Sequence, residues 1–175
     1  TNYVFSPQSL AFANLTADQT ADFAASIAPG VPILISEETS TRALALDSIL
    51  WAHEPFKLNS LFSSGSDSRT RVMLFAMNFD LLPGDTASAV TATAEDAAHR
   101  FYPLTVEAVG TVPGLNWLRF VAVRLHDDME DVGDVLVRIR IHNISSNRVR
   151  VGIGHIGGGP ADDSGAVPTP GRPPG

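Results

Sequence analysis

The stretch "DVLVRIRIHNISSNRVRVGIGH", residues 134–155, alternates apolar and basic residues, breaks at a polar loop and then alternates again. A period of two is typical of β-strands, in which successive side chains point to opposite faces of the sheet. Valine and isoleucine fall on one face, while Arg138, Arg140, Arg148 and Arg150 fall on the other. The stretch therefore predicts a hairpin that is apolar on one face and carries four arginines on the other.

The four arginines need anions nearby, because like charges that face each other on a sheet are unfavourable. One source is the carboxylates of neighbouring strands, such as Glu95, Asp96 or Glu107. The other is an acidic surface on a second copy of the chain, above all the run "HDDMED" at residues 126–131. The sequence leaves both open, and the second would place all four arginines at a subunit interface.

Segments rich in β-branched, aromatic or alternating residues also precede this hairpin. Turns such as Pro83-Gly84 and Pro113-Gly114 separate them, with proline and glycine placed as a type II turn requires. Several short strands at near-regular spacing are typical of an antiparallel sandwich. We expect an all-β, Ig-like antiparallel β-sandwich over residues 30–156; a capped helix at 40–50 is the weaker alternative. The expected strands before the hairpin are 42–51, 71–79, 87–96, 101–110 and 117–125.

The segment "RVMLFAMNF", residues 71–79, is apolar on both of its alternating faces. A strand of this kind needs cover on both sides. It is either a central strand of the sandwich or a surface that meets another subunit.

The two ends of the chain differ from the centre. Residues 1–29 form an N-terminal extension of short strand-like pieces, and two or three strands alone are marginal in water. Residues 157–175 are rich in glycine and proline and predict an extended tail. We expect strand addition between copies to bury the aromatic residues of the extension, which are Tyr3, Phe5, Phe12 and Phe23.

Composition narrows the classes of partner. The chain has 175 residues, which suits one domain with extensions, and a formal net charge of -7, which disfavours a nucleic-acid partner. It has no cysteine, so disulfides, thiolate metal sites and cysteine nucleophiles are excluded. No stretch approaches the roughly 20 apolar residues of a membrane span.

Motifs for catalysis are missing from the sequence. The five histidines never fall at metal-ligand spacing, and no Gly-x-Ser-x-Gly elbow or phosphate-binding glycine loop occurs. We therefore expect a non-catalytic protein without a cofactor.

The acidic run raises the possibility of calcium. Asp127, Asp128, Glu130 and Asp131 could supply carboxylate oxygens. The EF-hand template fails, because Val132 stands at its fifth position and no glutamate stands at its twelfth. A calcium loop of another kind and a solvated turn remain open. Two glycosylation sequons, at Asn14 and Asn143, fall at predicted turns.

Two stretches carry a resemblance to bacterial surface proteins. The segment "YVFSPQSLAFANLTADQTADFAA" resembles the last strands of carboxypeptidase-regulatory-like, Ig-type modules, and "RLHDDMEDVGDVLVRIRIHNISSNRVRVGI" is similar to the final hairpin of bacterial extracellular Ig-like repeats. The resemblance implies an Ig-type architecture and an extracellular or cell-surface location, with no catalytic residues. The matching residues are Tyr3, Phe5, Pro7, Ser9, Phe12, Asn14, Leu15, Gln19, Thr20 and Phe23 in the first segment, and Gly133, Asp134, Ser146, Asn147 and Val149 in the second.

Together these features predict an extracellular structural subunit that binds identical copies and assembles into a filament or cell-surface fibre. The alternative is an adhesion or carbohydrate-binding repeat of a larger surface protein, with surface glycans as partners. Such a site needs exposed aromatic side chains in a row. The candidates are Trp51, Phe101, Tyr102 and Trp117.

Overall fold

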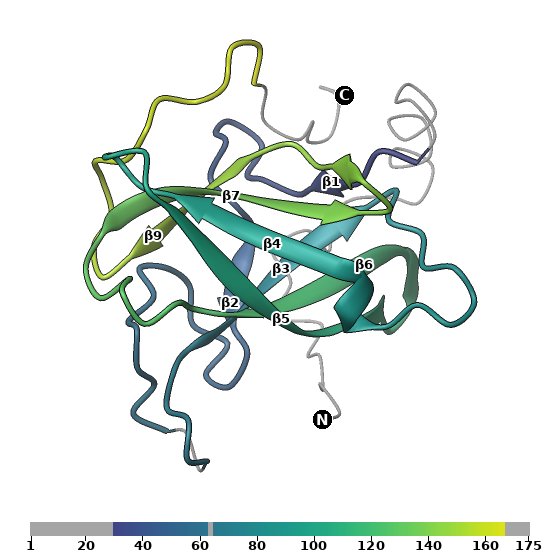
Figure 1. Cartoon of the computed structure of the whole chain (residues 1–175), viewed down its shortest axis with the longest axis horizontal. Helices are drawn as coiled ribbons and strands as arrows, with labels where there is room; N and C mark the ends of the chain where they lie inside the picture. Colours follow the sequence, from purple (N-terminus) through teal and green to yellow (C-terminus); the bar gives the residue numbers. More distant parts are fainter. Residues whose placement is uncertain (1–29, 63–64, 167–175) are drawn as a thin grey trace.

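The computed structural model describes residues 30–62 and 65–166 (Figure 1), and within them the regular structure is β with one 3-10 turn and no α-helix. The strands are β1 (Ile33–Leu34), β2 (Ala45–Asp47), β3 (Arg71–Met77), β4 (Val90–Glu95), β5 (Phe101–Val112), β6 (Leu115–Arg124), β7 (Gly133–Ile141), β8 (Ile144–Ser145) and β9 (Val149–Ile153); the 3-10 turn is η2 (Ala87–Ala89). No helix in this part of the chain is long and apolar enough to span a bilayer.

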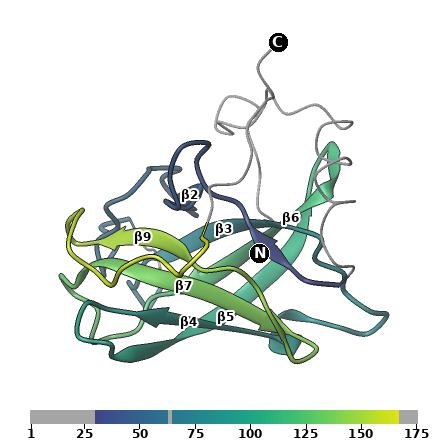
Figure 2. The same ribbon diagram turned by 90° about the horizontal axis from the view of Figure 1, so that it is seen from above.

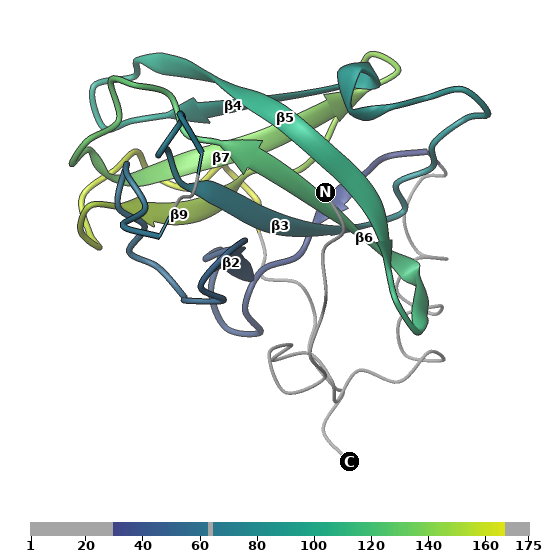
Figure 3. The same cartoon turned by 90° about the horizontal axis from the view of Figure 1, so that it is seen from below.

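The strands pair antiparallel in one continuous sheet that curves into a half-barrel. Its order is β1-β3-β6-β5-β4-β7-β8, with β2 also paired to β3 and β9 also paired to β7. Figures 2 and 3 show β5 running from β4 across to β6, so that this long strand joins the two halves of the sheet. The all-β prediction is confirmed, in the form of a half-barrel.

The outer edge of β9 is covered by two segments from earlier in the chain. Ala43 N–H donates to the Arg150 carbonyl, and Arg150 N–H donates to the Thr41 carbonyl. Phe56 exchanges backbone hydrogen bonds with Gly152 and Gly154 in the same way. These contacts satisfy backbone groups that an edge strand would otherwise expose.

The core lies inside the half-barrel, where the two halves of the sheet face each other. Leu74 of β3 and Val123 of β6 pack in one cluster with Val137 and Ile139 of β7. The alternating sequence of β7 fits this arrangement, because its valines and isoleucines point into the core. Arg138 and Arg140 point outward to solvent.

Strand β3 is buried on both faces. Val72, Leu74 and Ala76 belong to the inner cluster, while Met73, Phe75 and Met77 belong to a second cluster with Leu118 and Phe120 of β6. The central-strand interpretation of residues 71–79 therefore accounts for its two apolar faces.

The predicted strand at 42–51 shortens to β2, because Asp47 ends it. The Asp47 carboxylate accepts the backbone N–H groups of Ile49 and Leu50 at 2.8 and 2.9 Å, which turns the chain. Residues 87–89 form the 3-10 turn η2 instead of a strand, and Thr86 caps it. The weaker alternative of a helix at 40–50 is not observed.

The first part of the Gly/Pro-rich tail lies against β7 and β9. The Gly157 carbonyl accepts the N–H of Asp134, and the Pro160 carbonyl accepts a hydrogen bond from Arg150. Pro160 is buried. The predictions for residues 1–29, which include Tyr3, Phe5, Phe12, Asn14 and Phe23, and for residues 167–175 lie outside the described part of the chain.

Candidate functional site

The acidic turn, residues 126–131, joins β6 to β7 at one end of the half-barrel. A backbone hydrogen bond from Met129 to the His126 carbonyl closes the turn, and the Met129 side chain is fully buried in the inner core. Its two neighbours in sequence point the other way: the Asp128 side chain is 79% exposed, and Glu130 is also exposed. A buried methionine thus fixes the turn and leaves carboxylates in solvent on both sides.

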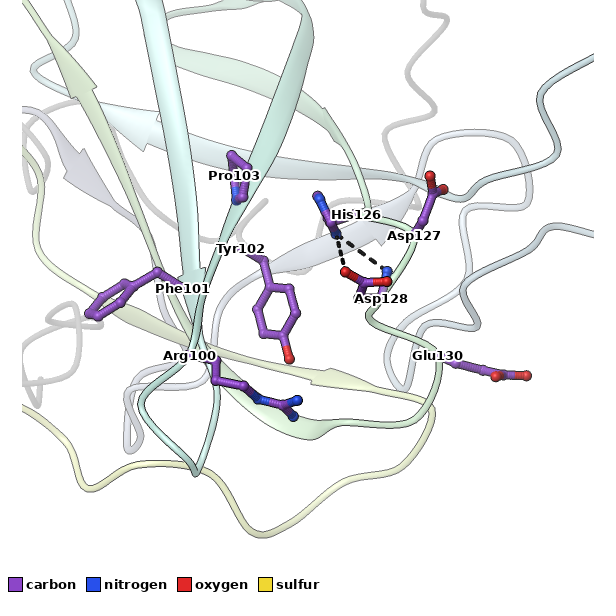
Figure 4. A pocket seen from close by; sticks show the side chains of 8 residues that line it. All are labelled: Arg100, Phe101, Tyr102, Pro103, His126, Asp127, Asp128 and Glu130. Carbon is purple, nitrogen blue, oxygen red and sulfur yellow. Dashed lines mark hydrogen bonds and ion pairs between the residues drawn. The ribbon is translucent and has the colours of Figure 1, made fainter.

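A hollow of about 600 Å³ lies between this turn and the start of β5 (Figure 4). Tyr102 and His126 form its aromatic part, with ring centroids 5.9 Å apart. The Arg100 guanidinium lies 5.8 Å from the centre of the Tyr102 ring, which is cation–π range. Phe101 points away to the other side of β5. The hollow therefore combines aromatic rings, one guanidinium and the carboxylates of the acidic turn.

Asp96 fixes the side chains of Tyr102 and Arg100. Its carboxylate accepts the Tyr102 hydroxyl and the Arg100 Nε–H, both at 2.8 Å, and the backbone N–H groups of Ala98 and Arg100. Burial raises the pKa of Asp96, but these hydrogen bonds outweigh burial and lower the pKa to about 2. Asp96 is therefore ionised at neutral pH and organises one wall of the hollow.

Replacing Asp96 with alanine is expected to lower the free energy of unfolding by about 2–3 kcal/mol at neutral pH, because several donors lose a buried acceptor. The folded-state pKa lies below the value of about 3.9 for an unfolded chain. The stabilisation is thus complete above about pH 4 and is lost as the pH falls towards 2. Urea unfolding of both proteins across this range measures it, and the exposed Asp80→Ala is the control. A difference that does not shrink in acid would contradict the assignment.

The candidate calcium ligands do not converge. Asp127 binds Arg69 at 2.8 Å, and Asp131 binds the His155 ring at 2.6 Å. Asp127 and Glu130 point in different directions in Figure 4. Within residues 30–62 and 65–166, no group of three histidine, aspartate or glutamate side chains is placed to hold a metal ion.

Two of the four arginines are neutralised within the chain. Arg148 binds Glu95 and Asp163, and Arg150 binds Asp162 at 2.7 Å. Both aspartates belong to the tail, where sequence analysis predicted only an extended segment; an isolated Asp-Asp pair among glycines and prolines gave no sign of this contact.

The other two expected carboxylates are engaged elsewhere. Asp96 binds Arg100 and Tyr102, and Glu107 binds Arg71 at 2.9 Å. Of the three carboxylates predicted from neighbouring strands, only Glu95 reaches the arginine-bearing face.

Arg138 and Arg140, the arginine pair, are exposed on the outer face of β7. Neither side chain makes a hydrogen bond or ion pair with another residue in the described ranges. Threonines stand opposite them on β4: Thr93 pairs with Arg138, and Thr91 pairs with Arg140. Ser145 of β8 pairs with Arg140 on the other side. The pair therefore lies exposed among hydroxyl groups. Asp163 is the described carboxylate whose charge acts on Arg138, without a hydrogen bond between the two side chains.

The aromatic candidates for glycan binding do not form one row. Trp51 and Trp117 pack, half-buried, against the second cluster. Phe101 is 62% exposed on the outer side of β5, and Tyr102 points inward. Of the two predicted glycosylation sites, Asn143 lies in the described part of the chain, and its side chain is exposed just after the end of β7.

No known protein-family profile, curated protein or solved structure matches this chain. The described residues define an all-β half-barrel with an acidic turn at one end and an arginine pair on an outer face. Its function is therefore proposed from these features.

Proposed function

We propose that this chain is a non-catalytic structural subunit of an extracellular or cell-surface assembly, in which copies associate by strand addition. The half-barrel is, in this proposal, a divergent Ig-like module. Its two halves pack around one core and are joined by β5, an arrangement compatible with that relationship. The resemblance of residues 124–153 to extracellular Ig-like repeats is the basis for the location.

The observation that carries the proposal is the outer half of β5. Strand β4 pairs with β5 only as far as Leu104, whereas β6 continues beside β5 to Val112. Over residues 105–112, β5 therefore has a named strand on one side only within the described structure. Unpaired backbone groups on such an edge are a template for an added strand.

The outer edges of β9 and β3 are covered within the described structure. Segments 41–43 and Phe56 cover β9, and β1 and β2 cover the far side of β3. We propose residues 105–112 as the place where an incoming strand adds; η2 lies beside part of this edge and would have to move aside. The alternating aromatic sequence of residues 1–29 is the segment that we propose for this role in a neighbouring copy.

Proline substitution on β5 tests strand addition. The N–H groups of neighbouring residues point to opposite sides of a strand, so one of Ala108 and Val109 carries its N–H on the open side. Proline removes that donor and blocks an added strand. We expect one of Ala108→Pro and Val109→Pro to stay folded by circular dichroism and to become monomeric in light scattering, while Val109→Thr, which keeps the N–H, assembles normally. If both proline variants fold and assemble normally, strand addition does not occur at this edge of β5.

A carbohydrate-binding repeat is the second candidate and depends on Phe101. Its ring is exposed next to the hollow, but Trp51 and Trp117 lie in a different part of the molecule. A single exposed ring offers less stacking surface than the row that glycan binding needs. Assembly is therefore the function that we propose first.

A further inference from the structure

The tail shows which chemistry the arginine-bearing face of the sheet selects. Asp162 and Asp163 lie across β9 and bind Arg150 and Arg148 through their carboxylates. The Asp163 carboxylate receives hydrogen bonds from both Nε and Nη2 of Arg148, the bidentate geometry that a guanidinium fork favours. Inside the chain, carboxylates therefore satisfy this face: the adjacent Asp162 and Asp163 of the tail, together with Glu95 of β4.

The arginine pair on the neighbouring strand lacks that cover. Arg138 and Arg140 are two residues apart on one face of β7, so their side chains emerge about 7 Å apart. Thr91, Thr93 and Ser145 are their strand partners, and Asp163 acts on Arg138 through its charge without a hydrogen bond. The pair is therefore a second place for carboxylates, because no side chain in the described part of the chain forms a hydrogen bond or ion pair with either guanidinium.

The acidic turn offers the complementary charges. Asp128 forms an ion pair with the His126 imidazole, at 3.7 Å, and its charge also acts on Arg100 across the hollow. Glu130 has no ion pair within residues 30–62 and 65–166. Asp127 is 75% exposed although it binds Arg69. The adjoining hollow has Tyr102 and His126 on its wall, and aromatic rings favour a guanidinium beside them, as Arg100 shows.

The two surfaces cannot pair within one copy. The acidic turn precedes β7 at one end of the half-barrel, whereas the arginine pair lies past the middle of β7 on its outer face. A contact between them must join different parts of two copies. Such a heterologous contact leaves both outer surfaces free and propagates into a chain unless a ring closes.

We propose that the acidic turn of one copy docks on the arginine pair of the next, with Arg138 and Arg140 entering the hollow beside Asp128 and Glu130. This proposal rests on the proposed function, because it names a head-to-tail contact within the assembly. Strand addition at β5 and this ionic contact use different residues, so each can fail without the other.

Substitutions that reverse the charge of one surface at a time test the contact in the full-length chain. Arg138→Glu/Arg140→Glu leaves two acidic surfaces, and Asp128→Arg/Glu130→Arg leaves two basic ones. We expect each variant to self-associate at least about tenfold more weakly than the wild type in low-salt light scattering. An equimolar mixture of the two should restore the mass of the wild-type assembly, because opposite charges then meet again at every contact. High salt should dissociate both the wild type and the mixture.

Matched variants separate this contact from other effects. Glu37→Arg/Glu38→Arg changes the net charge as much as the turn variant does, at exposed positions outside both surfaces, and should assemble normally. Arg138→Gln/Arg140→Gln removes the charge with little change of shape and should also weaken association. Wild-type-like assembly of the reversed variants, or a mixture that does not recover, would reject the contact while leaving assembly standing. A wild type that is monomeric at every concentration would reject assembly itself.

Discussion

Asp134→Ala is expected to lower the free energy of unfolding by about 3 kcal/mol, because it leaves a partly buried guanidinium without its main partner. The Asp134 side chain is 4% exposed and accepts two hydrogen bonds from Arg42, at 3.2 and 2.8 Å. Burial raises the pKa of Asp134, but hydrogen bonds from Arg42 and from the backbone of Gly157 outweigh it and lower the pKa. Arg42 keeps one ion pair, to Glu54 at 2.9 Å, which limits the loss.

The same contact connects three distant parts of the chain, so the substitution also has a local effect. Arg42 precedes β2, Asp134 is the second residue of β7, and the N–H of Asp134 donates to the Gly157 carbonyl of the tail. Chemical denaturation measures the global change, and hydrogen exchange at residues 157–163 measures release of the tail. Asp128→Ala, at a highly exposed aspartate, is the control and should leave the unfolding free energy nearly unchanged. A similar loss in both variants would mean that burial of the ion pair is not the cause.

Met129→Ala is expected to lower the free energy of unfolding by about 3 kcal/mol, because truncating a buried methionine removes apolar contacts and leaves a cavity. Met129 is fully buried and lines an interior void of about 10 Å³ with Val135, Val137 and Leu104. The truncated side chain enlarges that void at the end of the half-barrel. The acidic turn loses its anchor, so amide exchange at Asp128 and Glu130 should accelerate.

Met129→Leu is the matched control, because it keeps nearly the same volume and should cost less than about 1.5 kcal/mol. If the alanine variant is also below that value, the turn is held by its backbone alone. Self-association of the alanine variant should weaken at temperatures where the protein as a whole is still folded, since the carboxylates of the turn are no longer fixed.

The strands were predictable wherever local alternation and turn residues agree. Residues 134–142 became β7 within one residue at each end, and Pro113-Gly114 forms the tight turn between β5 and β6, with Gly114 at a φ of 81°. Gly133 has a φ of 72°, and a Cβ there would lie 2.7 Å from the Gly157 carbonyl oxygen, so only glycine fits. This explains in physical terms why a glycine precedes Asp134.

The candidate surfaces were predictable only in part. The acidic run and the outward arginines follow from charge and period, and both lie in the sequence stretch from 126 to 150. The sequence does not show which arginines form ion pairs among the described residues, because Arg148 and Arg150 bind tail aspartates that lie in a segment without periodicity. The hollow was also missed, since it needs β5 and the acidic turn to lie side by side.

Sequence alone determined that the chain forms antiparallel strands, that β7 turns its arginines outward and that an acidic turn precedes it, because these properties depend on neighbours along the chain. Tertiary structure decided the curvature of the sheet and the closure of β9 by residues 41–43. It also decided which two of the four arginines form ion pairs within the described part of the chain. The reason is distance in sequence: Arg42 meets Asp134, and Thr41 meets Asp162, only after the whole sheet has formed between them.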